Sequence, residues 1–194
     1  MRRIVVTEFV TLDGVMEGPG PNDPFELAGW TIQYGGQEIS KFKFDELFAT
    51  DAHLLGRVTY QGFAAVWPSM KDDAGFADRM NNLPKYVIST TLKKAEWNNS
   101  TIIRENVIEE VSKLKQQPGQ DILVAGSAGL VNTLIQHNLV DEYKLLVYPV
   151  VLGSGKRLFR EGSYAKLKLV ETKTFHSGVV LLHYLLNNKY EEHE

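Results

Sequence analysis

Short apolar runs alternate with segments of helical spacing through the middle of the chain. Four runs are strand-like: Ala52–Leu55, Tyr86–Ile88, Thr101–Ile103 and Ile122–Ala125. Three of them are followed by a segment whose apolar residues recur at helical intervals, and strands joined by helices usually pair in parallel. The run Ile122–Ala125 is apolar at every position, which is typical of a strand covered on both faces. The pattern predicts an α/β fold with a mixed, mostly parallel sheet flanked by helices.

Four helices are predicted from apolar spacing and from residues that start or stop a helix. Glu38–Phe48 places most of its apolar side chains on one face, and Arg57–Ala65 follows the first central strand. Asn106 is expected to cap the third helix, with Glu109 completing a capping box, and Pro118-Gly119 ends it. The apolar faces of the third and fourth helices comprise Val107, Ile108, Val111, Leu114, Leu130, Val131, Leu134 and Ile135.

The two ends of the chain add further strands. Ile4–Val10 is rich in β-branched residues and predicts a strand at the start. The last third holds three strand-like runs: Tyr143–Tyr148, Lys166–Thr174 and Val179–Leu186. The tripeptide His176-Ser177-Gly178 joins the last two as a turn, and a slip in alternation near Val170 indicates a β-bulge. We therefore expect an antiparallel C-terminal hairpin at one end of the sheet and a single domain over residues 1–194.

Composition excludes several classes of function. The absence of cysteine rules out disulfides, thiolate metal sites and cysteine nucleophiles. The net charge of −3 arises from interspersed charges of both signs, so no basic stripe is available to bind nucleic acid. No apolar run approaches the roughly 18 residues that span a membrane, and polar residues interrupt the first strand, unlike a signal peptide. We expect a soluble, cytoplasmic protein.

Three of the predicted strands end in residues that suit phosphate groups. The ends are Gly56-Arg57-Val58-Thr59, Ser89-Thr90-Thr91 and Gly126-Ser127-Ala128-Gly129. Ligands of open α/β sheets bind beyond the carboxyl ends of the strands, where helix-start amides, glycines, hydroxyls and a cation favour phosphates. Taken singly, each segment is more commonly a turn, a cap or a surface cation. The prediction of a phosphate site depends on the three segments lying at neighbouring strand ends.

Other motifs do not support a competing site. Gly153-Ser154-Gly155-Lys156 resembles part of a P-loop, but Val150 and Arg157 stand where that pattern requires glycine and a hydroxyl residue. The five histidines show no spacing suited to metal ligands. We predict no metal site.

Several motifs resemble those of the dihydrofolate-reductase superfamily, in the same order along the chain. They are Thr11–Gly14, Leu55–Tyr60 and Gly126–Leu130. Two further stretches, Leu139–Tyr143 and Pro149–Gly155, are similar to one branch, the bacterial riboflavin-biosynthesis reductase C-terminal domain family, which includes small stand-alone proteins. The resemblance extends from about Ile4 to Leu186 and implies a dihydrofolate-reductase-like fold.

The resemblance also implies that the chain binds NADPH. Gly56, Arg57 and Thr59 match the segment that holds the pyrophosphate and the adenosine phosphate of the cofactor. Arg57 with Ser89 and Thr90 matches the residues that read a 2′-phosphate, which favours NADPH over NADH. The second pyrophosphate turn and the helix start after it comprise Gly126, Ser127, Ala128, Gly129 and Leu130.

The substrate side of the site is less well defined by the resemblance. Asp13 and Gly14 match the substrate-side loop of the riboflavin branch, and Trp30 matches a tryptophan near the nicotinamide. Dihydrofolate reductases carry a carboxylate where this chain has Ser40, so folate is a poor substrate candidate. Asp13 and Glu38 are the candidate proton donors, although Glu38 is explained at least as well as a charge that stabilises a helix start.

Two functions follow from these residues. The first is an NADPH-dependent reductase that transfers hydride to a C=N or C=O bond of a small heterocyclic or ribosylaminopyrimidine-like substrate, with the Gly14–Trp30 loop excluding water. The second is a non-catalytic nucleotide-binding or sensor homodimer on the same fold. The family and the apolar run Val179–Leu186 both suggest a homodimer, but a strand buried within the sheet explains that run equally well.

Overall fold

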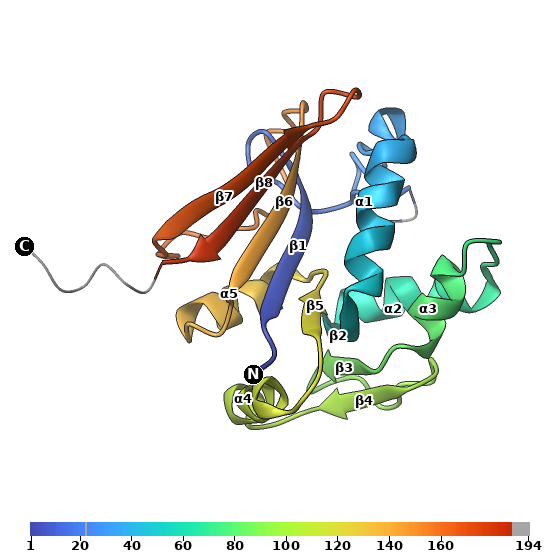
Figure 1. Cartoon of the computed structure of the whole chain (residues 1–194), viewed down its shortest axis with the longest axis vertical. Coiled ribbons are helices and arrows are strands. Elements are labelled where there is room, and N and C mark those ends of the chain that lie inside the picture. The colour runs from blue at the N-terminus through green and yellow to red at the C-terminus, as the bar shows by residue number, and fades with distance from the viewer. Residues whose placement is uncertain (22, 188–194) are drawn as a thin grey trace, which may run out of the picture.

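The structure is a computed structural model that describes residues 1–21 and 23–187. Within these residues, eight strands form one mixed sheet in the order β4-β3-β2-β5-β1-β6-β8-β7, with five α-helices packed around it (Figure 1). The strands are β1 (Ile4–Thr11), β2 (Thr50–Gly56), β3 (Lys85–Ile88), β4 (Ser100–Ile103), β5 (Asp121–Val124), β6 (Glu142–Tyr148), β7 (Leu167–Thr174) and β8 (Val180–Leu186). The helices are α1 (Gln37–Phe48), α2 (Arg57–Val66), α3 (Phe76–Asn82), α4 (Val107–Gln116) and α5 (Ala128–Gln136).

The sheet is parallel from β4 to β6 and antiparallel beyond. On β1, Val6 lies opposite Val124 of β5 and Tyr143 of β6, both in parallel register. The next strand, β8, runs antiparallel to both β6 and β7. The predicted mixed sheet with an antiparallel C-terminal hairpin is therefore confirmed. Because six adjacent strands point the same way, their carboxyl ends share one edge of the sheet.

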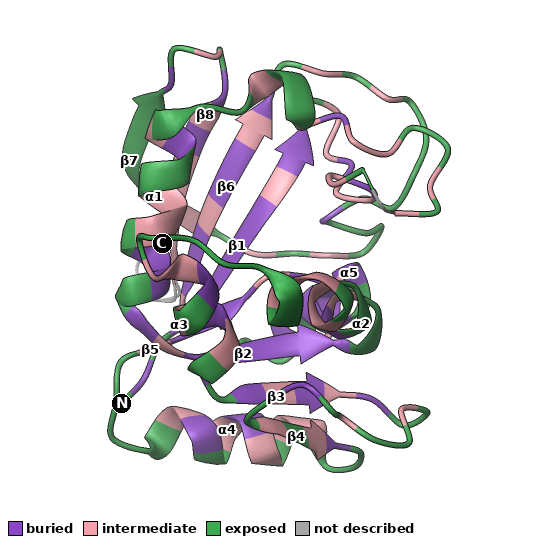
Figure 2. Cartoon of the chain, turned by 90° about the vertical axis from the view of Figure 1, so that its right-hand side faces the viewer, coloured by how far each residue is buried: buried purple, intermediate pink, exposed green. Residues whose placement is uncertain are grey.

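The core forms on both faces of the central strands, shown as purple segments in Figure 2. Ile4 and Val6 of β1 pack with Val131 and Leu134 of α5 on one face. On the other face, α1, α2 and α3 cover the sheet, and Leu55 packs there. This burial explains why the central strands lack polar alternation: they are covered on both sides.

The observed elements confirm one detail of the prediction and depart from it in two. A register shift between Leu169 and Glu171 confirms the bulge expected near Val170. The capping box at Asn106 is wrong, because that residue has a left-handed φ of 51° and its side chain makes no capping hydrogen bond. Helix α3 and the two short 3-10 helices, Ile32–Tyr34 and Trp67–Ser69, were not expected.

The run Val179–Leu186 supplies β8, which lies inside the sheet between β6 and β7. The interpretation as an internal strand is therefore confirmed, and β7 is the edge strand at this end of the sheet (Figure 1). Leu169 and Val170 of β7 are each 50% exposed, so this edge presents apolar side chains to solvent.

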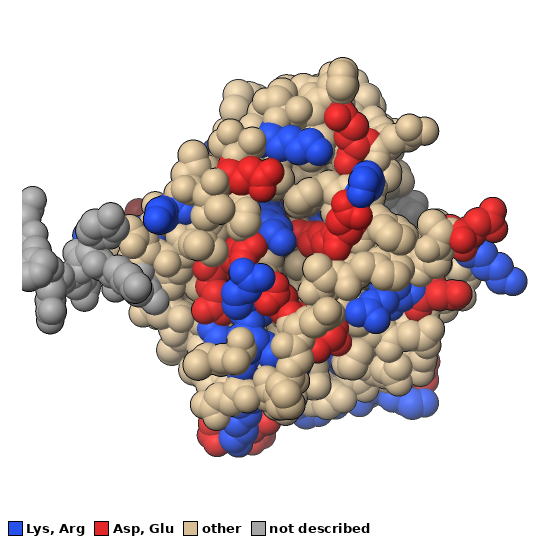
Figure 3. All heavy atoms as spheres, in the orientation of Figure 1, with Lys and Arg blue, Asp and Glu red and all other residues tan. Residues whose placement is uncertain are grey.

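Charges of both signs are mixed over the face shown in Figure 3, with no extended region of one sign. In the part of the chain that the structure describes, no helix has the length and apolar character needed to cross a membrane.

Candidate functional site

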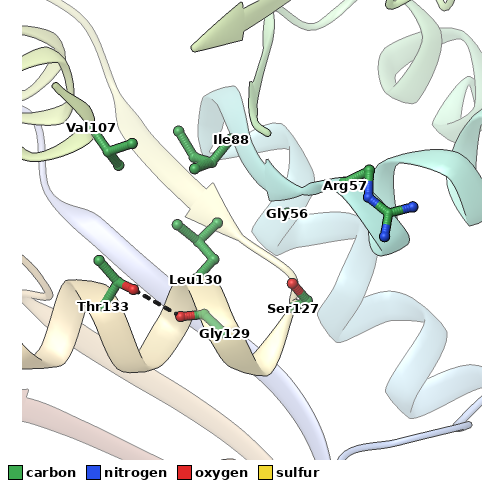
Figure 4. A pocket seen from close by; sticks show the side chains of 8 residues that line it. All are labelled: Gly56, Arg57, Ile88, Val107, Ser127, Gly129, Leu130 and Thr133. Atoms are coloured by element: carbon green, nitrogen blue, oxygen red, sulfur yellow. Dashed lines mark hydrogen bonds between the residues drawn. The ribbon is translucent and has the colours of Figure 1, made fainter. Parts of the chain in front are cut away.

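Two strand ends and two helix starts meet at the carboxyl edge of the sheet. Gly56 ends β2 and directly precedes α2, while Ser127 follows β5 and precedes α5. The Gly56 amide donates a hydrogen bond of 3.4 Å to the Gly126 carbonyl, because β2 and β5 are neighbours in the sheet. The first amides of α2 and α5 therefore lie side by side, as Figure 4 shows for Gly56, Arg57 and Ser127.

Glycine is needed for this close approach. A Cβ atom on Gly56 would lie 2.1 Å from the Ser127 hydroxyl oxygen. A Cβ atom on Gly126 would lie 2.6 Å from Thr59 Oγ1, and Gly126 has a φ of +81°, which disfavours other residues. The two turns can pack against each other only because neither glycine carries a side chain.

A cleft of about 230 Å³ opens in front of the two helix starts. Its lining residues are Gly56, Arg57, Ile88, Val107, Ser127, Gly129, Leu130 and Thr133 (Figure 4). The polar residues Arg57 and Ser127 lie at one end, and the apolar side chains of Ile88, Val107 and Leu130 face one another at the other. The cleft thus has one end suited to charged groups and one suited to a flat apolar ring.

The polar end of the cleft offers hydrogen-bond donors that the protein does not use itself. The first amides of a helix have no intrahelical acceptor, and no side chain caps α2 or α5. Arg57 is exposed, and its guanidinium donates only to Gln61 Oε1, at 2.9 Å, among the described residues. Unpaired amides at two helix starts beside a cation attract phosphate groups.

Half of the predicted cofactor residues line this cleft directly. They are Gly56, Arg57, Ser127, Gly129 and Leu130. Thr59 packs against Gly126, and Ala128 is buried at the start of α5. The structure therefore brings together the segments after β2 and β5, as the sequence predicted.

The segment after β3 takes a different role from the one expected. The Ser89 hydroxyl accepts hydrogen bonds from the amides of Leu92 at 2.9 Å and Thr91 at 3.2 Å, so it stabilises its own turn. Thr90 is exposed, and neither Ser89 nor Thr90 lines the cleft. From this strand end it is Ile88 that reaches the cleft.

Asp13 joins the loop after β1 to the segment after β6. Its carboxylate accepts hydrogen bonds from Thr11 Oγ1 at 2.6 Å, the Gly153 amide at 2.9 Å and the Leu152 amide at 3.2 Å. The Thr11 hydroxyl and these amides hold the pKa of Asp13 below its usual range. Gly14, with a φ of +82°, completes the turn, and its carbonyl accepts from the Leu158 amide. An ionised carboxylate with these partners fits positioning of the loop better than proton donation.

Replacing Asp13 by asparagine should lower the free energy of unfolding by about 1–2 kcal/mol, because an amide cannot accept all three hydrogen bonds. The pKa of Asp13 is lowered in the folded protein, so wild type should lose this stabilisation as the pH falls through that pKa. Urea unfolding at neutral and at acidic pH measures both effects. Asp73→Asn, at an exposed position, is the matched control. Equal stability of both variants at neutral pH would contradict this role.

Glu38 lies at the start of α1, away from the first cleft. Its carboxylate accepts hydrogen bonds from the His176 amide at 2.9 Å and contacts His176 Nδ1 at 2.8 Å. These contacts lower the pKa of Glu38. The residue lines a second cleft, of about 300 Å³, between the start of α1 and the turn that joins β7 to β8. Glu38 therefore links the helix to the hairpin.

Trp30 is packed inside the protein and is 7% exposed. Its indole N–H donates to the Glu17 carbonyl at 2.8 Å, and its ring meets Tyr148 edge-on, with 5.2 Å between centroids. These partners account for the position of the ring within the protein. Contact between Trp30 and a substrate stays a prediction.

Glu8 is an acidic residue that the sequence interpretation missed. It lies on β1, is 8% exposed, and its carboxyl oxygen accepts a hydrogen bond of 2.6 Å from the Gly126 amide. Burial raises the pKa of Glu8 to about 8. An acidic residue within a central strand that is buried on both faces is the signal that could have identified it.

Arg160 is a second cation beside the start of α5. Its Nη2 atom lies 3.7 Å from the place where a Cβ atom of Gly129 would stand. The residue is exposed, and it comes from the segment between β6 and β7. No strand or helix pattern in the sequence relates this segment to the cleft, because the contact depends on the tertiary fold.

Comparison with known proteins identifies the family. The model of the RibD C-terminal domain matches residues 2–181. The protein YyaP of Bacillus subtilis (strain 168) is 36% identical over 190 residues, which cover 96% of each chain. A pyrimidine reductase-like protein from Corynebacterium diphtheriae has a TM-score of 0.64 at 11% identity, over 97% of this chain and 93% of its own.

A dihydrofolate reductase from Enterococcus faecalis, solved as a complex with NADP(H) and RAB-propyl, has a TM-score of 0.61 at 15% identity. The match covers 96% of this chain and 97% of the reductase. These similarities confirm the dihydrofolate-reductase-like fold expected from the sequence. The family match extends over nearly the whole chain, and the resemblance to the riboflavin branch is confirmed with it. The chain belongs to the RibD C-terminal domain family.

Proposed function

We propose that the chain is an NADPH-dependent reductase that transfers hydride to a C=N or C=O bond of a small heterocyclic substrate, such as a ribosylaminopyrimidine. The observation that carries the proposal is the pair of helix starts that face one cleft, with Arg57 and Ser127 at its polar end. Membership of the RibD C-terminal domain family and the fold shared with an NADP(H)-bound dihydrofolate reductase support it.

The chemistry of the cleft residues supports the proposal of NADPH as the cofactor. The first amides of α2 and α5, with the Ser127 hydroxyl, would hold the pyrophosphate, which the glycines at positions 56 and 126 allow to approach. Arg57 would bind the 2′-phosphate, and Arg160 adds positive charge at Gly129. The adenine ring would lie among Ile88, Val107 and Leu130. When bound, NADPH supplies the hydride.

The rest of the chain would position the substrate and keep water out. Asp13 fixes the loop after β1 against the segment 150–158 through its amide contacts, and the Leu12 amide donates to the Val150 carbonyl at 2.8 Å. These contacts would hold the loop near the carboxyl end of β1. In this proposal Asp13 and Glu38, both with lowered pKa values, serve as positioning carboxylates and water is the simplest proton source.

A non-catalytic nucleotide-binding protein is the second candidate. The observation that favours it is that neither predicted proton donor lines the first cleft or has a raised pKa. Incubation with NADPH and a panel of pterins and ribosylaminopyrimidines, followed by the absorbance of the reduced nicotinamide, separates the two functions. Oxidation with any substrate supports the reductase, whereas binding without oxidation across the panel favours the second candidate.

Replacing Arg57 by alanine should weaken NADPH binding by about 10- to 100-fold and NADH binding much less, because only NADPH carries the 2′-phosphate. Titration of the fluorescence of the reduced nicotinamide measures both dissociation constants. Lys113→Ala removes a positive charge from the exposed surface of α4 and serves as the control. Equal weakening of both cofactors would remove Arg57 from the 2′-phosphate site.

The homodimer and the cytoplasmic location stay predictions. The exposed apolar residues Leu169 and Val170 on the edge strand β7 are compatible with contact to a second copy. Light scattering of the wild-type protein and of a Val170→Lys variant would determine whether this edge joins two copies.

A further inference from the structure

We propose that Glu8 is a positioning residue that holds the turn Gly126–Gly129 for the cofactor's pyrophosphate and makes cofactor affinity depend on its own charge. The inference rests on the proposed function, because it concerns the same phosphate-binding turn. It assigns a role to a buried acidic group that lies on the opposite side of this turn from the cleft-lining residues.

Glu8 takes the place of a missing main-chain partner. The parallel pairing of β1 with β5 ends at Val6 and Val124, so the next amides of the chain after β5 have no acceptor on β1. The carboxyl group of Glu8 reaches across this gap and accepts from the Gly126 amide at 2.6 Å. On its other side, the Gly126 carbonyl accepts from the Gly56 amide. The peptide groups that begin the turn are therefore held from both neighbouring strands.

The position of Gly126 determines where the amides of α5 point. Gly126 has a φ of +81° and packs against Thr59, and Ser127 directly follows it as the residue that precedes α5. A shift of this turn would move the amides that face the cleft. The hydrogen bond from Glu8 thus controls a phosphate-binding element without contacting the cleft itself.

The charges around Glu8 come mainly from α1. Lys43 Nζ donates to Thr7 Oγ1 at 2.7 Å and pairs with Glu46, and both Lys43 and Glu46 act on Glu8 through their charges. Lys43 favours the ionised form of Glu8 and Glu46 opposes it. On β6, Leu145 lies opposite Glu8 and does not titrate. On the cleft side of the turn the cations are Arg57 and Arg160.

The negative charges of Glu8 and of a bound pyrophosphate determine how ionisation of Glu8 affects pyrophosphate binding. A bound pyrophosphate adds negative charge on the far side of the turn from Glu8, and this opposes ionisation of the carboxyl group. By reciprocity, an ionised Glu8 weakens pyrophosphate binding. Burial raises the pKa of Glu8 to about 8, so the protonated form dominates at pH 7 and the affinity for NADPH should fall above pH 8.

The experiment is a titration with NADPH at constant ionic strength between pH 7 and 9.5, for wild type and for two variants at position 8. Wild type should lose affinity on the order of tenfold across this range. Glu8→Gln keeps an acceptor for the Gly126 amide and should bind like wild type at pH 7, with no such loss at high pH. Glu8→Ala removes the acceptor and should bind more weakly at pH 7. Lys85, with a pKa of about 8, titrates over the same pH range in wild type and in both variants. The test therefore uses only the differences in NADPH affinity between these three proteins.

A second measurement does not need the cofactor. In ¹H–¹⁵N spectra of the unliganded wild type, the Gly126 amide resonance should shift with a midpoint near pH 8, and in Glu8→Gln it should not. An equal pH dependence of NADPH affinity in wild type and Glu8→Gln would overturn the inference and leave the reductase intact. Failure of wild type to bind NADPH at pH 7 would overturn the proposed function. A Gly126 resonance in wild type without the pH-dependent shift would overturn the inference that the charge of Glu8 acts on the Gly126 amide.

Discussion

Gly56→Ala should abolish measurable NADPH binding and lower the free energy of unfolding by about 1–3 kcal/mol. The added Cβ atom would stand 2.1 Å from Ser127 Oγ and 3.2 Å from the Ser127 amide nitrogen. Rotation of the Ser127 side chain can relieve the contact with Oγ, but Ser127 Cβ and the Ser127 amide nitrogen, each 3.2 Å from the added atom, move only with the turn, so the two helix starts must separate. That separation removes the arrangement of amides on which phosphate binding depends.

Urea unfolding and NADPH titration of the same variant measure the two effects. Gly62→Ala is the matched control, because Gly62 lies in the same helix, α2, and a Cβ atom there would meet nothing within 4 Å. This control should be slightly more stable than wild type, since alanine favours a helix. Ser127→Ala added to Gly56→Ala should restore part of the stability by removing Oγ. Tight NADPH binding by Gly56→Ala would contradict the proposed site.

The sequence predicted the parallel part of the sheet well because its signals are local. The unbroken run Ile122–Ala125 supplies most of β5 (Asp121–Val124) near the centre of the sheet, covered on both faces. The glycines after β2 and β5 were predicted to lie together because parallel strands end at one edge. Their contact, through Gly56 and Ser127, follows directly from the neighbouring positions of these strands.

Elements that depend on distant partners were not predictable in the same way. Helix α3 begins after an irregular loop, and its first amides, those of Phe76 and Ala77, are capped by Asp72, which lies outside the usual capping position. Ser89 resembles a phosphate ligand in the sequence, but its own turn uses its hydroxyl. Two of the three hydrogen-bond partners of Asp13, Leu152 and Gly153, lie some 140 residues away along the chain, so its role depended on the fold.

The role of Glu8 depends both on a local signal in the sequence and on a contact that only the fold creates. An acidic residue in the run Ile4–Thr11 conflicts with burial on both faces, and that conflict is visible in the sequence. The residue it contacts, Gly126, is visible only once β1 and β5 are paired. A buried acidic group that is costly to ionise yet contacts the phosphate-binding turn is more naturally explained by function than by stability.

Glu8→Gln should therefore change how stability depends on pH. The pKa of Glu8 is about 8 in the folded protein against an ordinary value of 4.5, so between these values the folded chain keeps a proton that the unfolded chain releases. The unfolded state binds fewer protons at this position, so the Glu8 contribution to the free energy of unfolding of wild type should fall as the pH rises through this window, whereas His53, whose pKa is lowered to about 3, contributes with the opposite sign below pH 6.5 in wild type and variant alike. The slope is at most about 1.4 kcal/mol per pH unit. The stabilisation is complete below pH 4.5 and lost as the pH rises through 8.

Urea unfolding at intervals between pH 5 and 8.5 tests this, because Glu8→Gln should lack the Glu8 contribution to the slope. Glu105→Gln removes the same charge at an exposed position and should keep the slope of wild type. Other carboxylates do not produce the effect, since Asp13, Glu17 and Asp72 have lowered pKa values and act with the opposite sign at more acidic pH. Parallel curves for wild type and Glu8→Gln would show that Glu8 is ionised in the folded protein at neutral pH. In that case the carboxyl group would hold the Gly126 amide without any coupling of its proton to the cofactor.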